Sequence, residues 1–218
     1  ATLPPEDRWI LARLSRTIRA YHQCLATYQF SASVKELRDF FWDCLCDWYL
    51  ELTKPRLSPD AADQGSRGSA QQVLAFCMDQ CLRLWHPTMP FITERLWSQL
   101  NEIAPKRGLP CVAELRCDGL LIRAEFPPVE GYSALEDERI LATVEELQNA
   151  VRGVRDLRNR CNVAPKDRVK VTVVACDVGV IPQEIAPGLS PEIESSVIAA
   201  AARIAERTGL QLAAPHFR

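Results

Sequence analysis

The chain has 218 residues, of which 47% are hydrophobic and 25% charged, and its 26 basic and 28 acidic residues give a formal net charge of −2. This composition is typical of a globular protein of one large or two small domains and excludes a disordered tail or a fibrous repeat. No apolar run approaches the ~18–20 residues that cross a bilayer, and the N-terminal segment lacks the basic and apolar regions of a signal peptide. We therefore expect a cytoplasmic protein with no membrane partner.

Thirteen of the 16 aromatic residues, including all five tryptophans, lie in the first hundred residues, and no glycine precedes Gly65. Apolar residues spaced by three and four predict four amphipathic helices there. Asp7 is the expected N-cap of the first, which continues to about Tyr28, and Lys54–Pro55 is the expected end of the second because proline disfavours a helical residue before it. Short loops between such helices indicate a bundle. The expected ranges are 7–28, 33–54, 70–85 and 92–100.

The second half of the sequence mixes strand-like and helical patterns. Residues 120–126 alternate weakly and predict a short strand, whereas residues 140–161 carry a strong helical period. Residues 168–173 alternate as a strand, and 190–207 begin with a helix-start signal. We expect a mainly α fold, with a helical bundle followed by a small, truncated α/β unit. The expected domains are a bundle over 1–132, a long basic helix over 133–165 that completes it, and the α/β unit over 166–218.

The nine cysteines do not predict a disulfide framework, because their number is odd and five of them lie in helical sequence. Cys44-Leu45-Cys46 and the pair Cys77 and Cys81 also lack the C-x-x-C spacing of zinc sites, so we expect reduced, buried thiols. The three histidines have no nucleophile or metal-ligand set near them, and no phosphate-binding or dinucleotide-binding motif occurs. We expect no catalytic, cofactor or metal site in this chain.

One segment has a clear charge excess. Residues 152–170 contain seven basic and two acidic residues, so this segment carries +5 and the rest of the chain −7. Arg152 and Arg155 are three residues apart, as neighbours on one helix face are. Such a row can neutralise phosphates, but it is equally the composition of a solvated basic helix with internal ion pairs. Charge alone leaves both alternatives open.

Two stretches resemble signatures of valyl-tRNA synthetases. Residues 41–55, FWDCLCDWYLELTKP, are similar to the pattern F-x-W-x-x-F-C-D-W-Y-L-E-x-x-K-P, and residues 82–97, LRLWHPTMPFITERLW, are similar to L-R-L-L-H-P-F-M-P-F-I-T-E-E-L-W. The opening segment 7–11 and residues 154–165 follow in the family's order, so the resemblance covers about residues 6–175. The sequence departs from the pattern at Leu45, Trp85, Thr88 and Arg160–Cys161.

The resemblance implies the anticodon-binding region of a class I synthetase, which binds valine-accepting tRNA. The longer chain would carry catalytic and editing domains and would attach valine to tRNA with ATP. The ATP-site sequences His-Ile-Gly-His and Lys-Met-Ser-Lys-Ser do not occur here, and neither do the family's leading bundle helix and C-terminal coiled coil. We therefore expect an inactive piece of that enzyme without a cofactor. The tRNA contacts expected first lie in the basic segment and those expected second at the end of the second helix: Arg152, Arg155, Arg158, Lys166, then Lys54 and Arg56.

Other interpretations remain at this stage. The chain could come from an isoleucyl or leucyl enzyme, or it could be a helical protein-interaction module without RNA binding. Arg155 could pair with Asp156, and Lys54 could simply favour the negative end of its helix dipole. Asp47 and Glu51, one turn apart, are expected as polar partners inside the bundle. Four tryptophans could stack on bases, but their spacing favours the core: Trp42, Trp48, Trp85 and Trp97.

Overall fold

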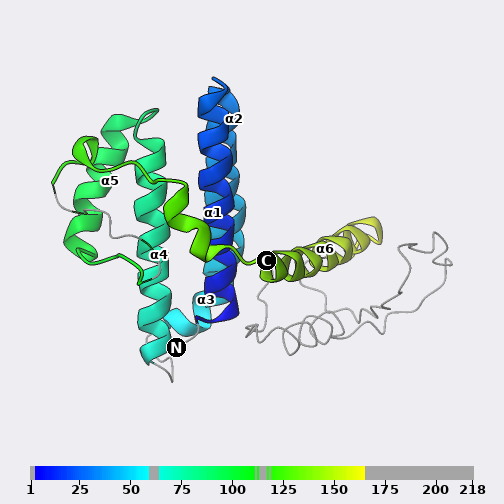
Figure 1. Cartoon of the computed structure of the whole chain (residues 1–218). Coiled ribbons are helices and arrows are strands. Elements are labelled where there is room, and N and C mark those ends of the chain that lie inside the picture. Colours follow the sequence, from blue (N-terminus) through cyan, green and yellow to red (C-terminus); the bar gives the residue numbers. More distant parts are fainter. Residues whose placement is uncertain (1–2, 59–63, 111, 113–116, 118, 165–218) are drawn as a thin grey trace. The chain divides into compact units, whose positions relative to one another are not determined.

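A computed structural model describes residues 3–58, 64–110, 112, 117 and 119–164, and all regular structure within these ranges is helical (Figure 1). The expected mainly α fold with a helical bundle is confirmed. The chain divides into two compact units, residues 1–141 and 142–218. The predicted strand at 168–173, the predicted helix at 190–207 and the α/β unit at 166–218 lie outside the described residues. The elements are α1 (Pro5–Ala26), α2 (Phe30–Asp39), the π-helix η1 (Phe40–Tyr49), α3 (Leu50–Leu57), α4 (Gln64–Trp85), α5 (Pro90–Ile103), the 3₁₀ turns η2 (Leu121–Arg123) and η3 (Glu130–Leu135), and α6 (Glu138–Arg160).

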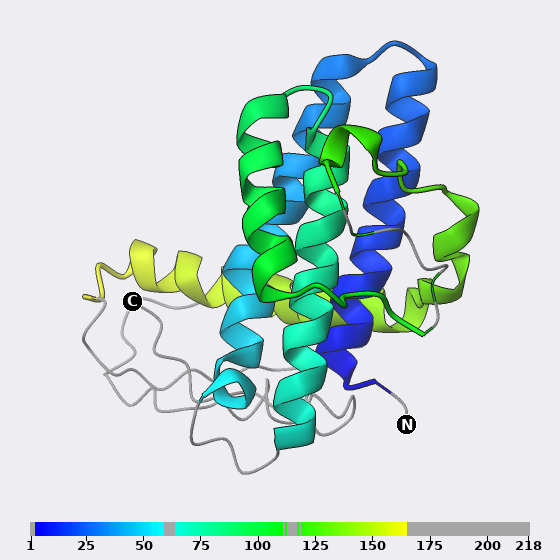
Figure 2. The same cartoon turned by 90° about the vertical axis from the view of Figure 1, so that its left-hand side faces the viewer.

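The first unit is a bundle whose long helices α1, α2, α4 and α5 run roughly along one direction (Figures 1 and 2). Helix α4 packs against α1, α2, α3 and α5, which makes it the central element. The predicted apolar stripe of α1 is buried from Leu11 through Leu14 and Ile18 to Tyr21. Burial of such a stripe, rather than helix propensity, supplies most of the stability of helices of this kind. None of the described helices is both long and apolar enough to span a membrane.

The predicted second helix exists, but its predicted end and the predicted set of core-facing residues are wrong. Elements α2, η1 and α3 follow one another without a break from Phe30 to Leu57, so the helix continues through Pro55. Proline removes one helical hydrogen bond, but Arg56, the next residue, is held by buried ion pairs that keep this turn in place. The predicted start at residue 33 is also three residues late, because α2 begins at Phe30.

The π-helical segment explains which side chains face the core. Each π turn takes one residue more than an α turn, so the buried face shifts along the sequence. An α-helical period predicts Phe41, Leu45 and Trp48 on the core face. The buried residues of η1 are instead Phe40, Cys44, Leu45 and Tyr49. As a consequence, Trp42 is turned outward and is 62% exposed.

The strand predicted at 120–126 is wrong, because its centre forms the short turn η2. No neighbouring strand exists among the described residues to pair with it, and side chains of the bundle bind its backbone instead. Glu94 accepts hydrogen bonds from the amides of Leu121 (2.9 Å) and Ile122 (3.3 Å). The Trp97 indole donates to the carbonyl of Gly119 at 3.0 Å. The segment is therefore fixed by side-chain contacts rather than by a sheet.

Charged side chains hold the start of α6 against α1 in the first unit. Three acidic residues at 136–138 pair with arginines spaced along α1. Burial tends to raise the pKa of Asp137, but the Ile140 amide and the Arg8 guanidinium outweigh it, so the net pKa is lowered. The pairs are Arg8 with Asp137, Arg16 with Glu138 and Arg19 with Glu136.

Residues 142–164 are the described part of the second unit. The predicted helix at 140–161 is confirmed as α6, and Val144, Leu147 and Val151 of its apolar stripe are buried. After Arg160 the chain closes the helix with a left-handed residue, Asn162, at φ 51°. Asparagine tolerates this conformation better than most residues other than glycine, so the cap is an ordinary one.

Candidate nucleic-acid interface

The predicted arginine row lies on the C-terminal half of α6. Arg152 and Arg155 are exposed, and Arg158 is partly exposed. Arg152 donates to the Asn149 side chain at 3.0 Å, and Arg158 donates to the carbonyl of Ala164 at 2.8 Å, just beyond the helix. Cations near a helix C-terminus are favoured by the helix dipole, and exposed guanidinium groups suit bidentate contact with phosphate. The fourth predicted contact of this segment, Lys166, lies outside the described residues.

The two residues predicted on the second helix have different environments. Lys54 is exposed and forms an ion pair with Glu51 at 2.5 Å, so this ammonium group can exchange its partner for another anion. Arg56 is only 7% exposed and bridges Glu6 (2.7 Å) and Asp7 (2.8 Å). This placement does not favour the RNA contact expected for Arg56. It favours a role in joining the start of α1 to the end of α3.

Arg56 belongs to a buried polar cluster, which sequence reasoning missed. Its second terminal nitrogen donates to Asp7 at 2.9 Å, and its Nε donates to the Ser66 hydroxyl at 2.7 Å. Burial tends to lower the pKa of Arg56, but the hydrogen bonds and charge of Asp7 outweigh it, so the net pKa is raised. Burial also raises the pKa of Glu6, whose Oε2 has no hydrogen-bond partner among the described residues.

Asp7 is the centre of this cluster because it joins three helices. The Tyr49 hydroxyl at the end of η1 donates to Asp7 at 2.8 Å, and Ser69 of α4 donates to it at 3.1 Å. Burial, together with the negative charge of Asp7, raises the pKa of Tyr49, so Tyr49 remains a donor. The prediction that Asp7 is the N-cap of the first helix is wrong, because α1 begins at Pro5 and Asp7 lies inside it. The residues that donate to the Asp7 carboxylate are instead 42 to 62 residues away.

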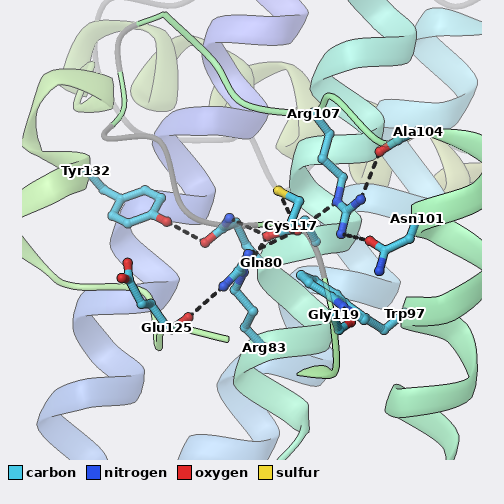
Figure 3. Close-up of polar contacts among 11 residues, drawn as sticks. Gln80, Arg83, Trp97, Asn101, Ala104, Arg107, Cys117, Gly119, Glu125 and Tyr132 are labelled. Carbon is cyan, nitrogen blue, oxygen red and sulfur yellow. Dashed lines mark hydrogen bonds and ion pairs between the residues drawn. The ribbon is translucent and has the colours of Figure 1, made fainter. Parts of the chain in front are cut away.

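A second buried cluster joins α4 and α5 to Arg107, Gly119 and Glu125, which follow α5 in the chain (Figure 3). Asp79 of α4 accepts hydrogen bonds from Arg83 (2.6 Å) and Arg107 (2.7 Å). Both guanidinium groups lie over the ring of Trp97, at 4.8 and 4.4 Å from its centroid. Two desolvated guanidinium groups over one Trp ring make a strong cation–π arrangement. Trp97, fully buried, confirms the core prediction for that residue.

The same cluster continues toward α1. Arg83 also donates to the carbonyl of Glu125 at 2.7 Å, and the buried Tyr132 hydroxyl bonds to Gln80. Burial, with the negative charge of Asp79, raises the pKa of Tyr132. The backbone of Tyr132 in turn accepts a bond from Ser15 of α1 at 3.0 Å. Glu125 and Tyr132, which lie between α5 and α6, are therefore tied to α4 and α1 by buried or partly buried hydrogen bonds.

The predictions for Asp47 and Glu51 and for the buried thiols have different outcomes. Asp47 and Glu51 are exposed, so the expectation that they are polar partners inside the bundle is wrong. Cys44, Cys77 and Cys81 are buried, as expected for thiols used as small apolar groups. Burial raises the pKa of all three, which keeps these thiols protonated.

Several aromatic side chains are exposed, which the helical period did not predict. Tyr28 and Phe30 flank the turn between α1 and α2 and are 81% and 59% exposed. Phe91, at the turn between α4 and α5, is 92% exposed. Both turns lie at the same end of the bundle (Figures 1 and 2). The only sequence signal was an aromatic residue beside a helix boundary.

Comparison with known proteins places this helical scaffold and its basic helix in a family. A family model described as the anticodon-binding domain of tRNA ligase matches residues 7–173. The chain belongs to this family. It is similar to valine--tRNA ligases of Rhodopirellula baltica (41% identity over 79% of this chain and 16% of that protein), Fervidobacterium nodosum (37% over 77% and 17%) and Legionella pneumophila strain Lens (32% over 74% and 16%). The chain thus spans about a sixth of the length of the curated relatives it matches.

Proposed function

We propose that this chain is the anticodon-binding part of a valine--tRNA ligase and binds the anticodon stem and loop of tRNA. The observation that carries the proposal is the family match over residues 7–173, which includes the exposed arginines of α6. Arg152, Arg155, Arg158 and Lys166 would neutralise phosphates, with Lys54 as a separate contact. Phosphate contacts of this kind position an RNA, and contacts with unpaired bases specify it.

The whole ligase would use ATP to attach valine to its tRNA. The binding region would help to place the acceptor end of the tRNA in a catalytic site elsewhere in the longer chain. The sequence of this fragment contains neither ATP-site signature, so the fragment alone is proposed to be inactive. Identity of 32–41% to valine--tRNA ligases supports valine over the isoleucyl and leucyl alternatives.

The experiment is a titration of the 218-residue chain with valine tRNA and an unrelated tRNA at several salt concentrations. Four phosphate contacts, one for each of the four basic residues named above apart from Lys54, predict an affinity loss of about 150-fold between 50 and 200 mM salt, from a slope of about −0.9 per contact. Reversing one charge, Arg155→Glu, should weaken both tRNAs and reduce this slope by about one. The matched control is Arg123→Glu, which makes the same charge change at an exposed arginine of η2.

Each result bears on a different part of the proposal. No binding would overturn tRNA binding by this chain, and salt-independent binding would overturn the proposed phosphate contacts. Equal affinity for the two tRNAs would remove the valine assignment and leave RNA binding. An unchanged affinity of Arg155→Glu, with helical content intact, would remove Arg155 from the interface.

One observation supports the competing interpretation of a protein-interaction module. Helix α5 carries exposed apolar side chains at Ile92, Leu96 and Ile103. Apolar patches on soluble proteins are frequent contact sites for other protein segments. A chain that ignores RNA in the titration above would favour this alternative.

A further inference from the structure

We infer that Tyr28 and Phe30 form a platform on which an unpaired base of the RNA stacks; this inference rests on the proposed function. The two residues flank Gln29 in the turn between α1 and α2, with side chains 81% and 59% exposed. Their rings contact each other edge to face, with centroids 6.3 Å apart and planes at 75°. This pair is here called the aromatic platform.

Tyr28, in the aromatic platform, has a backbone conformation that is unfavourable for a residue with a side chain. The amide of Gln29 bonds to the carbonyl of Cys24 (2.8 Å) and that of Tyr28 to the carbonyl of Leu25 (3.0 Å). This is the hydrogen-bond pattern that ends a helix with one left-handed residue, a position where glycine is strongly preferred. Here the residue is Tyr28, at φ 59°.

The same helix ending occurs at α6 with a suitable residue. There the amide of Val163 bonds to the carbonyl of Arg158 and that of Asn162 to the carbonyl of Asn159. Asn162 takes the left-handed position at φ 51°. The chain therefore uses asparagine at one such ending and a large aromatic residue at the other.

Tyr28 does not recover its backbone strain by packing. A non-glycine residue in the left-handed region is disfavoured, and residues held there cluster at functional sites. A buried ring would offset the strain, but the Tyr28 ring is 81% exposed and its ring contact is with another exposed ring. The arrangement presents aromatic surface to solvent at the expense of the fold.

The size and surroundings of the aromatic platform suit a base better than a protein surface. Its neighbours in sequence, Thr27, Gln29 and Ser31, are exposed and polar, so the apolar surface along this turn consists of two rings. A base is a flat ring of matching size, and unpaired bases of RNA loops are commonly held by stacking on aromatic side chains. Protein docking typically needs a larger contiguous patch.

The test uses a variant that separates folding from binding. Tyr28→Gly removes the ring and places the preferred residue at the left-handed position, so the melting temperature should not fall. Stacking of one base on an aromatic ring corresponds to a factor of about 5 to 150 in affinity, and Tyr28→Gly should weaken binding of an anticodon stem-loop RNA by that factor. Tyr28→Phe should retain the affinity.

The probe RNA carries 2-aminopurine at successive loop positions, and its fluorescence should be quenched on binding at one position and restored by Tyr28→Gly. A fully paired duplex of the same length should bind wild type and Tyr28→Gly equally, since it offers no unpaired base. Ile103→Ala, which removes an equally exposed apolar side chain from the far end of α5, is the control and should leave the affinity unchanged.

The outcomes are distinguishable. Stem-loop affinity that is unchanged in Tyr28→Gly, while Arg155→Glu weakens binding, would overturn the aromatic platform and leave the proposed function standing. An equal loss on stem-loop and duplex would overturn base stacking in favour of a backbone contact. A wild-type chain that binds neither RNA would overturn both proposals.

Discussion

Replacing Arg56 with methionine tests whether this residue is a structural cation rather than an RNA contact. Its guanidinium lies 2.7 Å from Glu6 and 2.8 and 2.9 Å from the two carboxylate oxygens of Asp7, and the side chain is 7% exposed. Methionine retains much of the volume but leaves two buried carboxylates without their cation. Breaking a buried pair in this way typically costs about 3–5 kcal/mol of folding free energy.

The matched control is Arg38→Met. Arg38 pairs with Asp39 at a similar distance, 2.6 Å, but its side chain is 66% exposed, so this change should cost at most about 1 kcal/mol. Urea denaturation followed by helical circular dichroism gives both values. For a chain of this size, the Arg56→Met loss corresponds to a decrease in melting temperature of about 6–20 °C.

The pH dependence of the stability loss in Arg56→Met tests whether unpaired buried carboxylates cause it. Without Arg56, the buried Glu6 carboxyl takes up a proton more readily in the folded state than in the unfolded state, so the deficit of Arg56→Met should shrink as the pH falls. A loss no larger than that of Arg38→Met would refute the structural role. Weakened tRNA binding at unchanged stability would restore Arg56 to the RNA interface.

Two further predictions follow from the buried clusters. Burial raises the pKa of Glu6 above its ordinary value of 4.5, so its stabilising contribution is complete below pH 4.5 and is lost as the pH rises through the folded-state pKa. Glu6→Gln should therefore gain stability relative to wild type between pH 4.5 and 7 in urea titrations, and an unchanged difference across that range would contradict a folded-state pKa raised by burial. Trp97→Phe removes the indole bond to Gly119 (3.0 Å) and weakens the contact with Arg83 and Arg107, which should lower the unfolding free energy by about 1–3 kcal/mol. A loss below about 0.5 kcal/mol would show that Trp97 contributes only apolar area.

Local patterns were sufficient for the helices but not for their registers. The stripe of α1 and that of α6 were predicted because burial of one helix face imposes a period that is visible in the residues themselves. The face of the segment 40–49 was not, because the π-helical turn changes that period without any separate sequence signal. Phe41 and Trp48 were placed on the core face for this reason, whereas Phe40 and Tyr49 are the buried residues.

The sequence by itself determined the helical class, the positions of the long helices, the basic segment around Arg155 and, through its signatures, the family. Tertiary structure decided which charged residues remain available to a ligand. Lys54 and Arg56 are two residues apart at the end of one helix, yet the first is exposed and the second is enclosed by Glu6 and Asp7 from the start of α1. Tertiary structure also decided that Tyr28 ends a helix in a left-handed conformation with its ring in solvent. The first outcome depends on contacts between distant segments and the second on the backbone conformation of one residue. The spacing of residue types along the sequence predicts neither.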